Sequence, residues 1–468
     1  MVLSIACVNL KMNDPSQSSS DEASMTAQLA GSEPEYKSYI IIGTAYALHD
    51  EDEPSKGRIM VMSSSLDGMS DTGTSSRTIR MVSELQVRGG VYSLCQFYQG
   101  KFLATINSKT QLCQLTNEGA EGPKLSMLGV GHHGHILSLF VKSRASELVS
   151  DQKSANKKDG AEGEEKEDDK KPKADEEMLA IVGDLMRSIS LVQYYPEHET
   201  LEEIARDFNA NWTTAVEMLS NDIFIGAENW NNLYVLRRNT KAQSDEIKCR
   251  LDTVGEFHLG EMCNKFMSGS LVMPLSSSPS SNTGAERTNR RRSLASPTKK
   301  SADGGKTGAS SSSNAAGRNL RPMVVVGSQT LFGTVDGTLG SILGLDGPTA
   351  AFFTALERAM ERVIKPVGNF SHKKYRAFSA EKRVHPSHGF VDGDLVESFL
   401  DLDSTSMQSV VQEMNKDGGW QLDDPAFAAA ESSNSSDRDS AMAVEDDGRP
   451  ELSVEDVVAV VEEMTMLH

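Results

Sequence analysis

Three histidines lie close together in the chain and are the residues whose type and spacing could bind a metal. His132, His133 and His135 follow a glycine-containing stretch, and imidazole nitrogens are common zinc ligands. No second cluster of His, Cys or Asp has a spacing suited to complete such a site, and histidines are common in turns. We therefore interpret the three histidines as turn residues and predict no metal and no cofactor.

The same stretch, Gly129-Val-Gly-His-His-Gly134, has the letters of a dinucleotide-binding loop. Such a loop must lie between a strand and a helix, because the glycines let a bound pyrophosphate approach the helix N-terminus. Here the following residues, 135–141, have the pattern of a strand instead. We interpret residues 129–134 as a turn between two strand units.

Two carboxylates, Asp184 and Asp207, raise the possibility of paired acid–base chemistry. An Asp that follows a strand ending in Gly more often caps a turn by accepting hydrogen bonds from backbone N–H groups, and we favour that role. No Ser-His-Asp or Cys-His arrangement accompanies them. The sequence therefore predicts a binding protein and not an enzyme.

The elements that carry these residues are short apolar strands in tandem pairs. Residues 180–238 contain two such pairs, with strands ending in Gly183 and Gly226 and an acidic connector between them. Further strands are expected at 39–43, 57–62, 102–106, 111–115, 330–335 and 340–343. Once long inserts are removed, the pairs recur every ~40–60 residues, which is the size of one propeller blade. We predict an incomplete β-propeller over residues 1–347.

The pattern changes after Gly347. Apolar residues from Phe352 to Ile364 have helical spacing behind Pro348, and further helices are expected at 395–402 and 406–414. A final helix follows Ser453-Val-Glu-Asp456, which resembles a capping box. We predict a small α-helical C-terminal domain over residues 348–468.

Composition limits the classes of function. The chain has 468 residues and a formal charge of −20, which argues against non-specific nucleic-acid binding as its main role. Polar or charged tracts at about 12–35, 150–177, 275–320 and 430–449 are expected to be disordered. The five cysteines form no C-x-x-C pair and are expected to be reduced. No signal peptide or membrane span is found, so we expect a soluble intracellular protein.

Several segments resemble the C-terminal part of the DNA-damage-binding protein 1 family. They are 183–188, 203–209, 257–261, 393–400 and the terminal helix from Ser453. Large subunits of the cleavage/polyadenylation and splicing machineries share the resemblance less closely. The resemblance implies a mainly β fold. This chain then corresponds to part of the third WD-repeat-like seven-bladed propeller, without about two of its blades, followed by the helical domain.

The resemblance also implies a function. Members of the family are adaptors that link cullin-4 ubiquitin ligases to WD-repeat substrate receptors in DNA repair, and their damaged-DNA recognition is largely the receptor's work. Cullin association is expected only where the other propellers are present. The alternative is an RNA-processing scaffold that contributes to nucleic-acid binding in a complex. The expected location is the nucleus, and also the cytoplasm.

The family binds a helical segment of the receptor in a cleft between its first and third propellers. The positions that match in this chain are Glu51, Glu53, Tyr92, Leu137, Leu139, Phe140, Arg187, Trp212, Asn264 and Val335. Trp212 has a competing interpretation as a core residue between blades. Its polar surroundings, Asn209-Ala-Asn-Trp-Thr-Thr, favour partial exposure, and with the resemblance we assign it to the interface.

A basic pair of clusters lies in the Ser-rich tract: Arg290, Arg291 and Arg292, then Lys299 and Lys300. Their spacing resembles a bipartite nuclear-localisation signal, and a solvated basic loop is the equally favoured alternative. Ser293 and Ser296 are candidate phosphorylation sites, where a phosphate would reverse the local charge.

Overall fold

The computed structural model describes residues 1–11, 36–66, 77–117, 122–144, 177–272, 326–366, 368, 370–418 and 451–467. The predicted disordered tracts lie outside these ranges, apart from Glu177, which forms an ion pair with Arg238 at 2.6 Å. The basic clusters at 290–292 and 299–300 also lie outside them.

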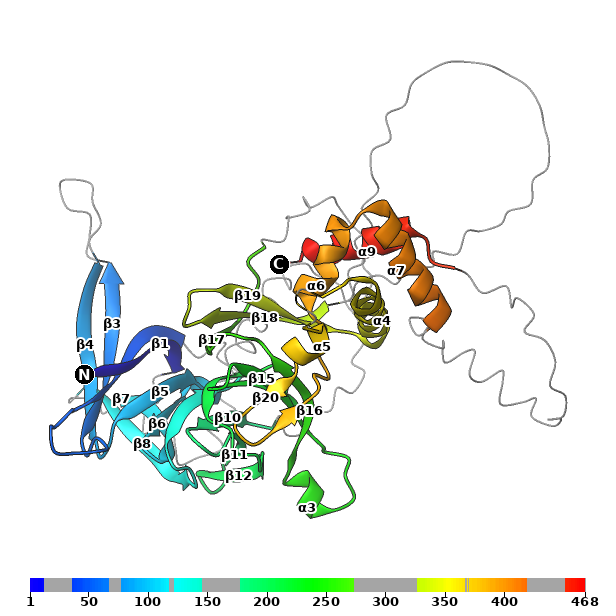
Figure 1. Cartoon of the computed structure of the whole chain (residues 1–468). Helices are drawn as coiled ribbons and strands as arrows, with labels where there is room; N and C mark the ends of the chain where they lie inside the picture. The colour runs from blue at the N-terminus through cyan, green and yellow to red at the C-terminus, as the bar shows by residue number, and fades with distance from the viewer. Residues whose placement is uncertain are drawn as a thin grey trace, which may run out of the picture.

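Nineteen strands within the described residues form five successive antiparallel blades (Figure 1). Blade A is β1 (Val2–Lys11), β2 (Tyr36–Ala45), β3 (Gly57–Leu66) and β4 (Arg77–Val87). Blade B is β5 (Val91–Gln96), β6 (Phe102–Ile106), β7 (Lys109–Asn117) and β8 (Pro123–His133). Blade C is β9 (Ser138–Lys142), β10 (Leu179–Asp184), β11 (Ile189–Tyr195) and β12 (Thr200–Arg206).

The remaining blades complete the series. Blade D is β13 (Thr213–Met218), β14 (Ile223–Glu228), β15 (Asn232–Arg238) and β16 (Leu251–His258), with the short helix α3 (Asp245–Lys248) before its last strand. Blade E has three strands, β17 (Cys263–Ser268), β18 (Val326–Thr334) and β19 (Leu339–Leu345). A 3₁₀ turn, η2 (Tyr98–Gly100), joins β5 to β6.

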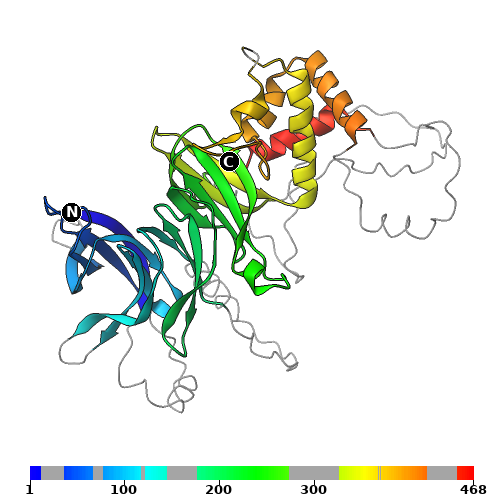
Figure 2. The ribbon, with the colours of Figure 1, turned by 60° about the horizontal axis from the view of Figure 1, so that its bottom comes forward.

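The first strand of each blade lies on the inside of an arc. β1 contacts β5, β5 contacts β9, β9 contacts β13, and β13 contacts β17. The blades follow one another in this arc from the N-terminal blue blade to the olive blade E, and the helices lie beyond blade E (Figure 2). This is propeller geometry, so the predicted partial propeller followed by helices is confirmed. The described residues hold five blades, against the seven that the resemblance implies.

The blades are held together by apolar side chains packed between neighbouring sheets. Ile41, Ile59, Val91 and Phe102 pack between blades A and B, whereas Ile181, Leu191, Phe224 and Tyr234 pack between blades C and D. Each strand contributes alternate residues to this core, as expected for sheets packed face to face. Four of the five cysteines lie in these strands, and all five are free thiols, as predicted.

The helical part begins directly after blade E. α4 (Gly347–Val363) starts behind Asp346, whose side chain accepts the Thr349 N–H at 3.0 Å. α6 (Gly393–Glu397), the 3₁₀ turn η5 (Ser398–Asp401), α7 (Ser404–Asp417) and α9 (Val454–Thr465) pack around one core. The predicted capping box between Ser453 and Asp456 is confirmed. No helix in the described part of the chain is long and apolar enough to cross a membrane.

One expectation about local structure was wrong. Residues 129–133 are not a turn but the end of strand β8, and the connection to the next blade begins only at Gly134. Residues 370–392 lie between α4 and α6. They contain the single turn α5 (His372–Tyr375) and a two-stranded hairpin, β20 (Phe378–Ser379) with β21 (Val384–His385), which lies against blade D.

Candidate interaction surface

Two kinds of connection emerge on the same side of every blade. Because the strands alternate in direction, the loop between blades and the turn between the second and third strands of a blade lie at the same end. Hydrogen bonds join them: Leu185 N–H to Leu137 O at 3.0 Å, Ser188 N–H to Asn211 O at 3.2 Å, and Asn229 N–H to Trp212 O at 3.0 Å. We call this side of the arc the loop face.

Asp184 organises the loop face at blade C. Its buried carboxylate accepts the N–H groups of Met186 and Arg187 in its own turn, each at 2.9 Å. It also accepts those of Ile136 and Leu137 in the preceding inter-blade loop, at 2.7 and 3.0 Å. The predicted role as a turn cap is confirmed. The structure adds that the same carboxylate ties two loops together, and so it positions the predicted site residues Leu137 and Arg187.

A second polar cluster organises the junction of blades C and D. Asp207 accepts the Ser188 hydroxyl at 2.7 Å and the Asn209 N–H at 3.0 Å, and Ser188 lies 3.3 Å from the Tyr234 hydroxyl. Burial raises the pKa of Asp207 and of Tyr234. A Cβ on Gly226 would lie 2.3 Å from the Tyr234 ring, so glycine is required there. This cluster fixes the backbone that leads to Trp212.

The loop face carries many exposed apolar side chains. Trp212 is 43% exposed in the loop between blades C and D, and Val335 is 55% exposed in the β18–β19 turn. The others lie in the β2–β3, β10–β11 and β14–β15 turns and in the inter-blade loops: Tyr46, Leu48, Ile136, Met186, Phe208 and Trp230. Aromatic and Met side chains of this kind are enriched in protein interfaces.

The ten predicted interface residues all belong to this face or to the inner strands that lead to it. Glu51, Glu53, Leu137, Arg187, Trp212 and Val335 lie in its loops and turns, whereas Tyr92, Leu139, Phe140 and Asn264 lie on β5, β9 and β17. None of the ten is buried. Burial and then the Glu53 charge raise the pKa of Tyr92. Partial exposure of Trp212 is confirmed; its role as a binding residue stays a prediction.

The C-terminal hairpin reaches the same face, which the sequence did not indicate. Asn232, at the end of the β14–β15 turn, donates to Ser379 O at 2.9 Å. Arg383 donates to the side-chain oxygen of Asn211, directly before Trp212, and its guanidinium lies 5.1 Å from the Phe378 ring centroid. The hairpin therefore extends the surface beside Trp212 and adds a positive charge to it.

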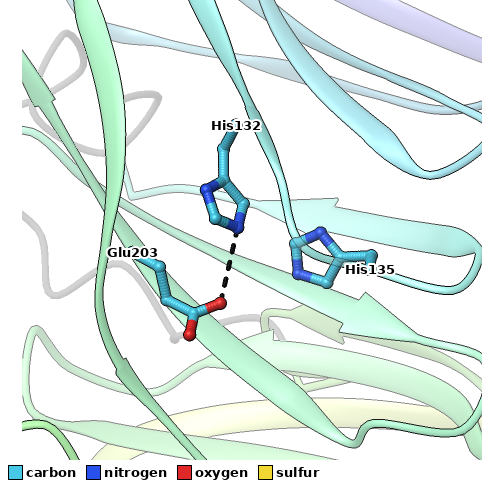
Figure 3. Close-up of side chains that lie close together, drawn as sticks. All are labelled: His132, His135 and Glu203. Carbon is cyan, nitrogen blue, oxygen red and sulfur yellow. Dashed lines mark ion pairs between the residues drawn. The ribbon is translucent and has the colours of Figure 1, made fainter.

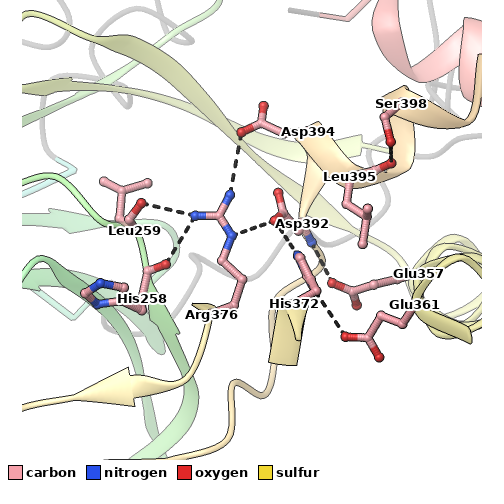
Figure 4. Close-up of polar contacts among 10 residues, drawn as sticks. All are labelled: His258, Leu259, Glu357, Glu361, His372, Arg376, Asp392, Asp394, Leu395 and Ser398. Carbon is pink, nitrogen blue, oxygen red and sulfur yellow. Dashed lines mark hydrogen bonds and ion pairs between the residues drawn. The ribbon is translucent and has the colours of Figure 1, made fainter. Parts of the chain in front are cut away.

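A buried ion-pair network fastens the hairpin and the helices to blade D (Figure 4). Arg376 Nε donates to Asp392 at 2.5 Å, and Arg376 Nη1 donates to the carbonyls of His258 and Leu259 at 3.3 and 3.1 Å. His372 contacts the same Asp392 carboxylate at 2.7 Å and Glu361 at 3.1 Å. The hydrogen bond to Asp392 raises the pKa of His372. The network is structural, because its charges are paired within the chain.

A third group of polar side chains lies between blades B and C, behind the loop face. The nearest side-chain atoms of His132 on β8 and Glu203 on β12 are 3.4 Å apart, and His135 lies beside them (Figure 3). Arg206 Nε pairs with the other Glu203 oxygen at 2.7 Å. Burial lowers the pKa of His135 to about 4. Glu203 could not be recognised from the sequence, since it comes from a different blade and no sequence spacing links it to the histidines.

The glycines of the G-x-G-x-x-G letters have packing roles at this position. Gly129 has φ +51°, and a Cβ there would lie 1.8 Å from the Glu199 carbonyl oxygen. A Cβ on Gly131 would meet the Thr110 carbonyl oxygen at 2.5 Å, and one on Gly134 would meet His132 Nε2 at 2.7 Å. Because a strand and not a helix follows, the letters are not a dinucleotide loop.

The arc of blades and the attached helices define a protein with a partial β-propeller and a helical C-terminal part. The sequence pattern of the family described as "CPSF A subunit region" matches residues 2–139 and 173–401, so the chain belongs to this family. The chain is 36% identical over 377 residues to DNA damage-binding protein 1a of Arabidopsis thaliana and to DNA damage-binding protein 1 of Solanum lycopersicum. The predicted resemblance to the DNA-damage-binding protein 1 family is confirmed.

Each of these two alignments covers 81% of this chain and 27% of the relative. DNA damage-binding protein 1 of Oryza sativa subsp. japonica is also 36% identical, over 378 residues. The chain thus spans about a quarter of the length of these relatives. Their names describe DNA damage-binding proteins, and none of them names an enzyme.

Proposed function

We propose that this chain is the substrate-receptor-binding part of an adaptor for cullin-4 ubiquitin ligases, acting in DNA repair and protein ubiquitination. The observation that carries this proposal is the loop face: six of the ten predicted contact residues lie on it, the other four lie on the inner strands that lead to it, and all ten are at least partly exposed. Its partner is a helical segment of a WD-repeat receptor. An amphipathic helix presents an apolar side to such a surface, and Trp212 with Val335 supplies exposed apolar contacts.

The charges on this surface indicate which charge the partner helix carries. Asp50, Glu51, Asp52 and Glu53 are consecutive and exposed in the β2–β3 loop. Facing charges of opposite sign steer association and set orientation more than they add affinity. The acidic loop therefore favours a receptor helix that carries basic residues on one side.

The remaining parts of the proposal concern the assembly. The chain covers only 27% of its relatives, and we propose cullin-4 association only for an assembly that also contains the other propellers. Damaged DNA is contacted through the receptor, so the isolated chain binds duplex DNA weakly and with strong salt dependence. The proposed location is the nucleus, with a cytoplasmic pool.

An RNA-processing role is the second candidate, and the description of the matching family, which names a CPSF subunit, favours it. Affinity purification of the tagged chain from cells followed by mass spectrometry separates the two. WD-repeat receptors among the specific partners support the adaptor. Recovery of polyadenylation or splicing subunits without receptors would overturn it in favour of the second role.

Trp212→Ala tests the binding surface directly. A half-exposed interface tryptophan contributes about 2 kcal/mol or more to binding, so the dissociation constant for a fluorescent peptide of the receptor helix should rise about 30-fold. The unfolding free energy should fall by less than about 1 kcal/mol, because much of the ring is already in solvent.

The matched control is Ile79→Ala on β4, which is 58% exposed but lies on a strand away from the loop face. It should leave peptide binding unchanged. If Trp212→Ala unfolds the protein while the peptide affinity of the folded fraction is unchanged, Trp212 is a core residue and the assignment of the surface is wrong.

A further inference from the structure

The cluster between blades B and C has the donor set of a transition-metal site. In the described part of the chain, His132, His135 and Glu203 offer one ligand atom each, and these atoms all lie within 4.8 Å of one another. Two imidazole nitrogens and a carboxylate oxygen suit Zn²⁺ and similar divalent ions. The side chains come from strand β8, the inter-blade loop and strand β12, so they converge from three separate elements (Figure 3).

The environment of His135 is independent evidence for a ligand at this site. It is only 8% exposed, and neither of its ring nitrogens has a hydrogen-bond partner among the described residues. His132 Nε2 makes no hydrogen bond of standard geometry, although it lies 3.4 Å from Glu203 Oε2. Buried polar atoms are nearly always satisfied, and an exception requires an explanation such as a bound water or ion. A buried imidazole whose nitrogens have no hydrogen-bond partner, close to a carboxylate, matches the donor set that a metal ion requires.

One of the three distances between the ligand atoms already fits a tetrahedral ion. Ligands at about 2.0–2.1 Å from tetrahedral Zn²⁺ lie about 3.4 Å from each other, and His132 Nε2 is 3.4 Å from Glu203 Oε2. His135 must approach by a small side-chain rotation, and Gly134 leaves room, since a Cβ there would crowd His132 Nε2 at 2.7 Å. The rings of His132 and His135 are 5.1 Å apart at an interplanar angle of 78°.

Arg206 occupies the outer side of the site. Its Nε donates to Glu203 Oε1 at 2.7 Å and its Nη2 donates to Oε2 at 3.1 Å, and Oε2 also lies 3.4 Å from His132 Nε2. Such outer contacts orient a ligating carboxylate. The Arg206 charge also opposes a bound cation, so the site suits an ion that neutral imidazoles bind strongly and not Ca²⁺ or Mg²⁺, which prefer oxygen ligands.

We propose that His132, His135 and Glu203 bind one divalent transition-metal ion, with Zn²⁺ as the fitting ion, and that the ion fastens blade B to blade C. In the described structure the outer strands of these blades share a single residue pair, Val130 with Thr200. An ion held by β8, the inter-blade loop and β12 adds a cross-link at this junction. Three protein ligands leave the fourth tetrahedral position for a water molecule.

The test uses the full 468-residue chain. After loading with Zn²⁺ and dialysis against metal-free buffer, the wild type should retain about one ion per chain, and zinc should raise its unfolding temperature. His135→Asn should weaken zinc binding at least about tenfold and abolish the thermal shift. The control is His133→Asn: His133 adjoins the site in sequence but is exposed and outside the group of three.

Co²⁺ substitution in the wild type keeps the proposal testable even if His135→Asn fails to fold. Visible absorption of a tetrahedral ion with nitrogen and oxygen ligands, without a sulfur charge-transfer band, supports the site. A sulfur band would place the metal on a cysteine such as the exposed Cys249. That result, no retained zinc, or equal retention by His135→Asn would each overturn the proposal.

Discussion

Replacing Asp184 by Asn changes the loop face without changing the size of the side chain. The carboxylate accepts four backbone N–H groups, two on each oxygen. An amide has a single acceptor oxygen, so two of the four N–H groups would face an NH₂ donor instead. A hydrogen bond to a charged group contributes about 1.5–3 kcal/mol, and Asp184→Asn should therefore lower the unfolding free energy by roughly 3–6 kcal/mol.

Urea unfolding followed by tryptophan fluorescence measures this loss. Hydrogen exchange adds a local readout, because the amides of Ile136, Leu137, Met186 and Arg187 should lose protection before those of the strands. The matched control is Asp222→Asn, an exposed carboxylate in the β13–β14 turn, which should change stability by no more than about 0.5 kcal/mol. A loss below about 1 kcal/mol for Asp184→Asn would refute the reasoning, since the two loops would then not depend on the carboxylate.

Two further predictions concern contacts that join one part of the molecule to another. Gly129→Ala should lower the unfolding free energy by more than about 1 kcal/mol, because φ is +51° and the new Cβ would meet the Glu199 carbonyl oxygen at 1.8 Å. The control is Gly122→Ala, at φ +83° with nothing within 4 Å, which should cost only the backbone strain of about 1 kcal/mol. Equal losses of unfolding free energy in urea would contradict the contact with Glu199. His372 has a raised pKa, through Asp392 first and Glu361 also, beside Glu357 and Arg376. Its stabilising effect should be complete below its unfolded pKa of about 6.5 and lost as pH rises through the higher folded pKa. The stability difference between wild type and His372→Gln should therefore shrink as the pH rises above about 6.5; a difference that grows would show that the pairing is misassigned.

Elements with strong local signals were predictable from the sequence. Strand β6 was expected at 102–106 and has those bounds, and the Ser453 capping box was read from four consecutive residues. In both cases a short-range pattern, a continuous apolar run or a cap, determines the structure. The apolar spacing of the helix after Ser453 also predicts one stripe of Val457, Val458, Val461 and Met464; all but the half-buried Val458 are buried, and Val460 is buried with them.

Features made by contacts between distant residues were not predictable. Hairpin β20–β21 has two residues in each strand, too few for any periodicity. The end of β8 contains two glycines and two histidines in place of alternating apolar residues, because it passes close to Glu199 and Thr110. Glu203 reaches His132 only through the packing of one blade against the next. No spacing in the sequence encodes these approaches.

The hairpin on blade D has a consequence for the order in which the protein is made. Blades A to D are each built from consecutive strands, so they can form as the chain leaves the ribosome. Arg383 and Ser379, however, reach Asn211 and Asn232 across 172 and 147 residues of sequence. At about 5–20 residues per second, translation delivers them roughly 10–30 seconds later. The surface beside Trp212 is therefore completed only after residues 379–383 have been made, well after the strands of blades C and D.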